Sequence, residues 1–302
     1  MRWTPAEAAL LQEYVQQGLG YDVIVERFAD RGIARTYKSI QRKVEQERNR
    51  APEAWHMRMP ASSVQRYNKP LEVTGDAVIM GDVHCPFHDA HWMDRVIGLA
   101  LKRGVRQVIL AGDFADFNAF SSFGRDVGID ADAELDALSA LMDALIATFE
   151  RVYYIAGNHD VRPLRVLKDA GLSAPALMRL FAPRPDDKHF FTSDYHWCRL
   201  TSGGVPWQIE HPKNASVNAT IVPKALAAKY GCHVIGTHGH TWGMTRDVSG
   251  RYFAVDSGIC ADPLRLGYTQ LIHNTRPLQQ QGAVIVQDGL PLLVSPQTMA
   301  LY

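Results

Sequence analysis

The stretch AVIMGDVH at residues 77–84 passes directly from an apolar run into a polar turn that carries Asp82 and His84. Short apolar runs bounded by turn residues are typical of buried strands. Four further apolar runs end in the same way, and the polar residues that follow them are Asp113 and Asp116, Asn158 and His159, His211, and His238 and His240. Since ligands gather outside the carboxyl ends of strands in an open α/β sheet, we expect these side chains at one edge. Their carboxylate, amide and imidazole groups suit two divalent transition ions such as manganese, iron or zinc.

In this order, the five stretches resemble the calcineurin-like metallophosphoesterase superfamily. The family pattern is D-x-H, G-D-x-x-D, G-N-H-D/E, a single His and a closing H-x-H pair. Here the corresponding residues are Asp82-x-His84, Gly112-Asp113-x-x-Asp116, Gly157-Asn158-His159-Asp160, His211 and His238-x-His240. The resemblance covers about residues 71–290. It implies an α/β fold of the metallophosphoesterase type, an αββα sandwich in which helices flank two mixed sheets.

The resemblance also implies a role for each motif residue. One cation would be bound by Asp82, His84, Asp113 and His240, and a second by Asp113, Asn158, His211 and His238. Asp116 would orient His159, which would protonate the departing oxygen while a hydroxide bridging the cations attacks phosphorus. General-acid help of this kind is worth roughly 10²–10⁴ in rate. Manganese is the predicted metal, with iron, zinc or nickel as alternatives.

Three residues beside the motifs are candidates for contacts with the substrate. His88 lies in the loop after His84, Arg162 lies just beyond His159, and Asn214 follows His211. Arginines are common on exposed helix faces, and this is the alternative for Arg162. Asp160, in contrast, is expected to be structural.

The first fifty residues show the pattern of three short helices. Thr4-Pro5-Ala6-Glu7 has the form of a capping box before the first helix, and Thr36 is the predicted cap of the third. Between residues 30 and 50, seven Lys or Arg residues oppose three acids. A basic third helix resembles helix-turn-helix or Myb-like DNA-binding domains, in which the last helix enters the major groove. The candidate nucleic-acid contacts are Lys38, Arg42 and Lys43. The alternatives are a solvated helix face and a bundle that docks on another protein.

Composition and length describe an ordinary globular protein. The 302 residues are 46% hydrophobic and 21% charged, and the net charge is zero. Any contact with nucleic acid must therefore be local, since the molecule as a whole carries no charge excess. Residues 51–70 lose periodicity and contain three prolines, so they form a predicted linker between a helical domain (1–50) and a catalytic domain (71–302).

Nothing in the sequence predicts a signal peptide or a membrane segment. The amino terminus has no apolar signal core, and no run reaches the roughly 18 apolar residues that span a bilayer. Four scattered cysteines, at positions 85, 198, 232 and 260, favour reduced thiols in a cytoplasmic protein. No sequence feature sets the oligomeric state, and no membrane partner is expected.

Hydrolysis of a phosphorus ester is the predicted reaction, with the phosphoester substrate as the expected partner. The basic helical domain favours a phosphodiester in DNA or RNA, and so a nuclease or phosphodiesterase. The alternatives are hydrolysis of small phosphomonoesters or phosphodiesters and a phosphoprotein phosphatase; the run GDFADF at residues 112–117 lacks the Arg-Gly found there in serine/threonine phosphatases. A nucleic-acid-binding adaptor with an inactive catalytic domain is a third hypothesis, which the complete set of ligands disfavours.

Overall fold

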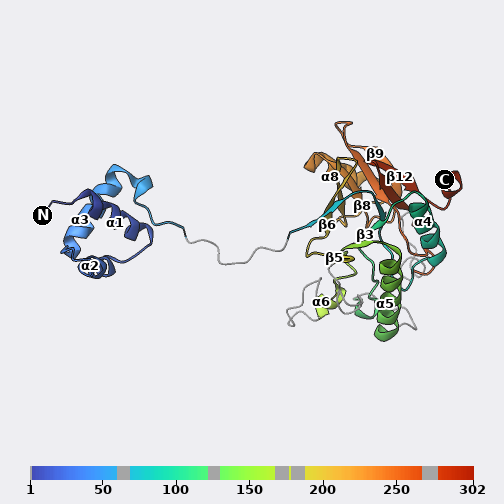
Figure 1. Cartoon of the computed structure of the whole chain (residues 1–302), viewed down its shortest axis with the longest axis horizontal. Coiled ribbons are helices and arrows are strands. Elements are labelled where there is room, and N and C mark those ends of the chain that lie inside the picture. The colour runs from blue at the N-terminus through green and yellow to red at the C-terminus, as the bar shows by residue number, and fades with distance from the viewer. Residues whose placement is uncertain (1, 60–68, 122–129, 167–176, 178–187, 267–277) are drawn as a thin grey trace. The chain divides into compact units, whose positions relative to one another are not determined.

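The computed structural model describes residues 2–59, 69–121, 130–166, 177, 188–266 and 278–302. The chain forms two compact units, Met1–Arg66 and Tyr67–Tyr302, and Figure 1 colours each of them along the chain. Residues 60–68 of the predicted linker lie outside the described residues. No helix in the described ranges is long and apolar enough to cross a membrane.

The described part of the first unit contains α1 (Pro5–Gln16), α2 (Tyr21–Ala29), α3 (Tyr37–Arg50) and the short 3₁₀-helix η1 (Pro52–Ala54). Thr4 caps α1 through the predicted capping box, in which its hydroxyl accepts a bond from the Glu7 amide. Thr36 caps α3 in the same way through the Ser39 amide. The helices bury a small core of Leu11, Tyr14, Val15, Ile24, Phe28, Ile40, Val44 and Trp55. Trp55 follows α3, so the helical core continues into the segment predicted to be a linker.

Arg35 is a buried basic residue of this unit. Its guanidinium pairs with Glu7 at 2.8 Å, donates to the Arg2 carbonyl oxygen at 2.9 Å and lies 4.4 Å from the centre of the Trp3 ring. The hydrogen bond from Arg35 lowers the pKa of Glu7 to about 2. Arg35 therefore ties the start of α1 to the turn before α3 and is not part of the exposed basic surface.

The second unit contains two mixed sheets, each of six strands within the described residues. In spatial order, the first sheet consists of β1 (Leu71–Thr74), β6 (Trp197–Ser202), β7 (Val205–Glu210), β8 (His233–Gly236), β10 (Phe253–Ser257) and β9 (Trp242–Arg246). The second consists of β12 (Leu290–Val294), β11 (Ala283–Gln287), β2 (Ala77–Met80), β3 (Gln107–Ala111), β4 (Arg151–Ile155) and β5 (Phe190–Thr192). The helices within the described part of this unit are α4 (Ala90–Lys102), η2 (Asn118–Phe120), α5 (Ala131–Thr148), α6 (Arg162–Val166), α8 (Ile221–Tyr230) and η4 (Met299–Leu301).

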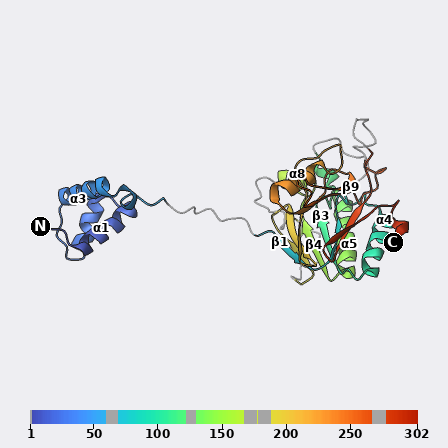
Figure 2. The same ribbon diagram turned by 90° about the horizontal axis from the view of Figure 1, so that it is seen from above.

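The sandwich forms because its central strands are apolar on both faces. In β2, Val78 and Met80 pack with residues of α4 and α5, while Ile79 packs between the two sheets. This division follows from the strand period, since alternate side chains point to opposite faces. Figure 2 shows α4 and α5 next to each other beside the strands. On the first sheet, Ala227 of α8 packs against Val234 and Ala254. The order helix, sheet, sheet, helix confirms the predicted αββα fold.

Strands from both sheets bring their carboxyl ends together. In the second sheet β2, β3 and β4 are parallel neighbours, and in the first sheet β7 and β8 are parallel neighbours. The hydroxyl of Thr237, just after β8, donates to the carbonyl oxygen of Ala111 at the end of β3 at 2.7 Å. The polar residues predicted to follow these strands therefore meet at one edge of the sandwich.

Candidate dimetal centre

Five residues of the predicted site have left-handed backbone conformations, which are strained for residues other than glycine. Their φ angles are 50° at Asp82, 47° at His84, 49° at Asp113, 70° at His238 and 55° at His240. Each such conformation costs on the order of 1–2 kcal/mol for an L-residue, and strained residues cluster at active sites and ligand clamps. The turns hold one another, since the Asp82 amide donates to the Gly112 carbonyl at 3.0 Å and the His84 amide to the Asp113 carbonyl at 2.9 Å.

Asp82, His84 and His240 form a first cluster of potential metal ligands. His240 Nε2 lies 3.1 Å from Asp82 Oδ1 and 3.4 Å from His84 Nε2, and His84 Nε2 lies 4.0 Å from Asp82 Oδ1. Bonds of about 2.0–2.2 Å to a shared ion place ligand atoms about 3–4 Å apart, so these distances fit one cation. Burial opposes ionisation of Asp82, but the adjacent imidazole of His240 lowers the pKa of its carboxyl overall. The cluster thus presents an anionic oxygen and two imidazole nitrogens to one point.

Asp113, His211 and His238 form a second cluster, which Asn158 adjoins. His211 Nε2 lies 3.4 Å from Asp113 Oδ2 and 3.1 Å from Asn158 Oδ1, and the His211 and His238 rings are 4.8 Å apart between centres. The Thr237 hydroxyl lies 2.8 Å from His211 Nδ1, which leaves Nε2 directed at the cluster. Burial opposes ionisation of Asp113, but the imidazole of His211 holds the pKa of that carboxyl well below its usual range. These groups fit a second cation.

Asp116 links the first cluster to His159. Its Oδ1 lies 2.9 Å from His84 Nδ1 and 2.9 Å from His159 Nδ1. Although burial opposes ionisation, these two bonds hold the pKa of Asp116 well below its usual range. A carboxylate on the second nitrogen of a metal-binding imidazole fixes the tautomer and leaves Nε2 for the metal. His84, Asp116 and His159 also lie close enough to form a ligand cluster by themselves, but the hydrogen bonds make Asp116 a support for the two rings.

Arg162 touches the other nitrogen of His159. Its Nη2 lies 3.0 Å from His159 Nε2, and its Nη1 donates to the Asp116 carbonyl oxygen at 2.7 Å. A guanidinium can only donate, so Nε2 accepts this bond and Nδ1 carries the proton that His159 donates to Asp116. In this arrangement Arg162 occupies the nitrogen from which His159 would have to protonate a leaving group. Arg162 therefore contacts His159 and Asp116, and its predicted role in substrate binding stays a prediction.

Two buried carboxylates hold the ligand-bearing loops in place. Asp160 accepts bonds from the Ala115 amide at 2.8 Å and the Gly157 amide at 2.7 Å, which ties the loop after β3 to the loop after β4. Asp256 accepts a bond from the Thr241 hydroxyl at 3.0 Å, directly after His240, and burial raises the pKa of Asp256 to about 6. Asp256 is a site residue that was not predicted, and its only signal in the sequence is a carboxylate inside the apolar strand β10.

The two remaining substrate candidates are His88 and Asn214. His88 Nδ1 is buried without a hydrogen-bond partner within the described residues, and His88 pairs with Ala261 in an isolated β-bridge. Asn214 is exposed in the loop between β7 and α8. Roles in substrate binding for His88 and Asn214 stay predictions.

Gly112 packs against the ring of His211, and substitution of this glycine tests that contact. A methyl group at Gly112 would overlap the ring of His211, whereas Gly104 has a similar φ, +81° against +82°, and nothing within 4 Å of the added carbon. In both Gly112→Ala and Gly104→Ala, the left-handed backbone conformation alone should lower the free energy of unfolding in urea by about 1 kcal/mol. Only Gly112→Ala should displace His211 and weaken metal binding, by about 10–100-fold in a calorimetric titration. Equal metal affinity in both variants would contradict this placement of His211.

The fold and the site together define a class, that of two-sheet sandwich hydrolases whose carboxylates and imidazoles hold divalent metal ions. Residues 77–251 match the calcineurin-like phosphoesterase family. The match spans more than half of the chain, so the chain belongs to that family and is a metal-dependent phosphoesterase.

Solved structures with a similar arrangement have sequences that differ widely from this one. Vacuolar protein sorting 29 from Cryptosporidium parvum is 12% identical with a TM-score of 0.37, over 73% of this chain and 95% of that one. The phosphoesterase Yfce from E. coli is 14% identical with a TM-score of 0.36, over 73% and 98%. A dimetal phosphatase from Danio rerio is 10% identical with a TM-score of 0.36, over 75% and 99%. No curated protein sequence matches the chain significantly.

Proposed function

We propose that the chain hydrolyses phosphodiester bonds in nucleic acid with two divalent cations, and that these are manganese ions. The observation that carries the proposal is the position of Asp116, whose Oδ1 joins the ring of His84 to the ring of His159. The two ring centres are 4.5 Å apart. A metal-binding imidazole and a proton-transferring imidazole thus share one carboxylate, which suits cleavage of an ester whose leaving oxygen needs a proton.

The described clusters fit the proposed ligand sets. One cation would be held by Asp82, His84, Asp113 and His240, and the other by Asp113, Asn158, His211 and His238. Asp113 lies in the second cluster, and its role as a bridge is part of the proposal. Two such ions supply Lewis-acid charge beside the phosphoryl oxygens and lower the pKa of water. The mixture of carboxylate, amide and imidazole donors is compatible with manganese.

His159 transfers the proton to the leaving group in this proposal. Asp116 holds His159 Nδ1, which orients the ring and stabilises it when it is charged. His159 Nε2 lies 3.0 Å from Arg162 Nη2 and 4.0 Å from Asp113 Oδ2, on the side of the second cluster. A guanidinium offers paired donors to phosphate oxygens. When Arg162 turns to such an oxygen, Nε2 is free to take up a proton from water. The imidazolium, which Asp116 stabilises, would then donate that proton to the departing oxygen and return to the neutral form.

A substrate panel tests the reaction. Manganese-loaded protein is assayed on bis-p-nitrophenyl phosphate, p-nitrophenyl phosphate, single-stranded DNA and double-stranded DNA. The proposal expects a higher kcat/KM for the diester than for the monoester, together with cleavage of DNA. A preference for the monoester without cleavage of DNA would instead favour a phosphatase of small substrates or phosphoproteins. Absence of turnover on every substrate, combined with DNA binding, would favour an inactive adaptor.

Support for a nucleic-acid substrate comes from the outward side of α3. Ile40 and Val44 face the core of the helical unit, so the opposite side of the helix faces solvent. The exposed side chains of α3 include Lys38, Gln41, Arg42, Glu45 and Asn49. Arginine and lysine contact phosphates and guanine, and amide side chains pair with base edges. Lys43, in contrast, pairs with Glu47 at 2.5 Å along the same helix.

The double variant Lys38→Gln/Arg42→Gln tests this surface. If both residues contact phosphates, the slope of log affinity against log salt concentration should become smaller by about 2, because fewer counterions are released on binding. Fluorescence anisotropy with a labelled DNA duplex measures the slope in the full chain. Arg27→Gln, on the exposed end of α2, is the matched control and should leave the slope unchanged. An unchanged slope in the double variant would argue for the alternative of a protein-docking bundle.

A further inference from the structure

Two strand pairs bring a third group of side chains to the edge that carries the metal clusters. Trp242 begins β9 and pairs with Ser257 at the carboxyl end of β10, which runs parallel to β8. In the other sheet, Ala283 begins β11 and pairs with Val294 at the end of β12. Since β11 is antiparallel to β2, the start of β11 lies beside the end of β2 that leads to Asp82. The residues around Trp242, before Ala283 and after Val294 therefore lie on the same edge as the proposed dimetal centre.

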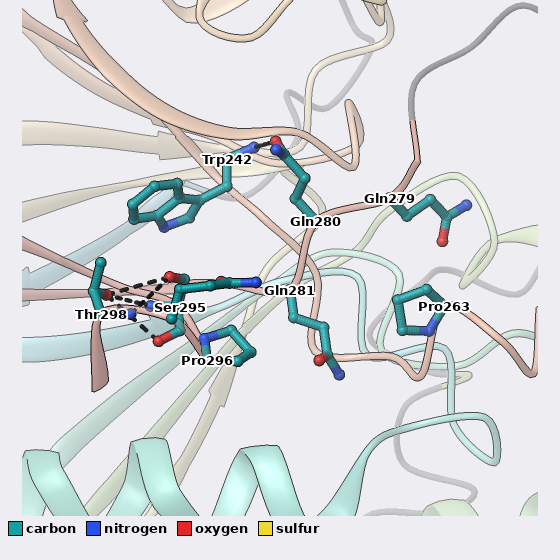
Figure 3. Close-up of a pocket in the computed structure, with 9 residues that line it drawn as sticks. Trp242, Pro263, Gln279, Gln280, Gln281, Ser295, Pro296 and Thr298 are labelled. Carbon is teal, nitrogen blue, oxygen red and sulfur yellow. Dashed lines mark hydrogen bonds between the residues drawn. The ribbon is translucent and has the colours of Figure 1, made fainter. Parts of the chain in front are cut away.

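These residues enclose a cavity of about 410 Å³, which we call the glutamine pocket. It is lined by the ring of Trp242 and by Gln279, Gln280, Gln281, Ser295 and Gln297, among other residues. Figure 3 shows the Trp242 ring on one side and Ser295 with Thr298 on another. Binding sites for small molecules have volumes of roughly 300–1,000 Å³. The glutamine pocket is large enough for a nucleoside.

Hydrogen bonds connect the pocket to His240, one of the proposed metal ligands, and to the cap of α4. The Gln280 amide donates to the carbonyl oxygen of His240 at 3.0 Å, and the Gln280 side-chain oxygen accepts a bond from the Trp242 amide at 2.9 Å. Gln281 Nε2 donates to Asp89 Oδ2 at 2.8 Å, which fixes this side chain to the cap of α4. A group bound in the pocket would thus lie on the His240 side of the first cluster.

The chemistry of the lining selects a neutral, planar, hydrogen-bonding group. None of the described lining residues is charged, so the pocket is unsuited to a phosphate, which Arg162 and the cations are better placed to bind. An indole ring offers a stacking surface for a base, and glutamine amides present a donor and an acceptor that match base edges. The Trp242 amide bonds to the side-chain oxygen of Gln280 and not to its Nε2. This Nε2 and the side chain of Gln297, which also lines the pocket, are the groups that we expect to bond to a base.

We propose that the glutamine pocket binds the nucleobase of a nucleoside monophosphate unit whose phosphate ester is cleaved at the adjacent dimetal centre. This inference rests on the proposed phosphodiesterase function and adds to it a binding site for the base of the nucleotide that is cleaved. The base stacks on Trp242, and the amides of Gln280 and Gln297 bond to its edge. The base belongs either to a free nucleotide or to a nucleotide within a strand, and both sources present the same chemistry.

A comparison of two diesters with the same leaving group tests the pocket. Thymidine 5′-(p-nitrophenyl phosphate) carries a base and bis-p-nitrophenyl phosphate does not, so the ratio of their kcat/KM values reports base binding. In Trp242→Leu the ratio should fall about tenfold, the loss expected for one aromatic–base stack, and Trp242→Phe should restore most of it. Gln297→Leu should lower the ratio several-fold. Gln287→Leu, at the opposite end of β11, is the matched control and should retain the ratio of the wild type.

The outcomes separate this inference from the function on which it rests. Failure of the wild type to hydrolyse either diester would overturn the proposed function. If the wild type hydrolyses both diesters, and Trp242→Leu and Gln297→Leu keep the wild-type ratio of kcat/KM values, then base binding in the glutamine pocket is contradicted while the proposed function stands. Calorimetric titration of the metal-free chain with thymidine monophosphate measures binding to the pocket without the reaction. The affinity should be about tenfold lower in Trp242→Leu than in the wild type. Equal affinities would overturn the inference. Competition by thymidine monophosphate identifies free nucleotides as the source of the base, whereas competition by an oligonucleotide alone identifies a strand.

Discussion

Asp113→Asn is expected to abolish the paired metal site and, with it, catalysis. Asp113 Oδ2 lies 3.4 Å from His211 Nε2, and its Oδ1 accepts the His159 amide at 2.7 Å. An asparagine keeps the shape and still accepts the amide, but it removes the negative charge and places a donor in the cluster. A carboxylate can bind one cation through each oxygen, and a neutral amide is a poor bridge. The variant should therefore fold and yet fail to hold two ions.

The expected loss of activity is large. A two-metal site contributes several kcal/mol of transition-state stabilisation, so loss of the pair should lower kcat/KM for bis-p-nitrophenyl phosphate by about a thousandfold or more. Metal content per chain by mass spectrometry and initial rates are the measurements. Asp143→Asn, on the exposed side of α5, is the matched control and should keep both ions and full activity. Two ions in Asp113→Asn at the wild-type affinity would contradict the bridging role.

His159→Ala should separate metal binding from proton transfer. His159 is not part of either proposed ligand set, and Asp116 still holds His84 when the second ring is removed. Both ions should therefore remain bound. Turnover should fall because no group donates a proton to the leaving oxygen, by roughly 10²–10⁴ where that oxygen is a poor leaving group. The loss should be much smaller for p-nitrophenolate, which departs readily without a proton.

Rates for a series of diesters with leaving groups of increasing basicity give the measurement. A steeper dependence of kcat on leaving-group basicity in His159→Ala than in the wild type is the expected result. His91→Ala, on the exposed start of α4, is the matched control and should show the wild-type dependence. Equal losses for good and poor leaving groups would assign His159 a positioning role in place of general-acid catalysis.

The sequence was sufficient to predict the layers of the catalytic unit and the placement of the ligand-bearing turns. Strands such as β2, with Val78 and Ile79 buried on opposite faces, read as uninterrupted apolar runs, and the polar turn after each one is easily recognised. The helix caps Thr4 and Thr36 could also be predicted, because capping depends on neighbours only a few residues apart.

The supporting contacts could not be predicted, because they depend on tertiary structure. The bond from Arg162 to His159 requires the turn between β4 and α6, and Thr237 reaches Ala111 only when the two sheets are packed together. Asp256 resembles any polar residue near a strand end until Thr241 is seen to bond to it. The glutamine pocket joins residues distant in the chain through the pairing of β9 with β10 and of β11 with β12. Propensity and periodicity carry no information on such pairings.

The most direct test of the central claim is anomalous X-ray diffraction from crystals of the manganese-loaded chain. We expect two peaks about 3.5–4 Å apart, one surrounded by Asp82, His84 and His240 and the other by Asn158, His211 and His238, with Asp113 between them and His159 bound to neither. A single peak, or two ions with His211 directed away from both, would contradict a dimetal phosphoesterase centre in this chain.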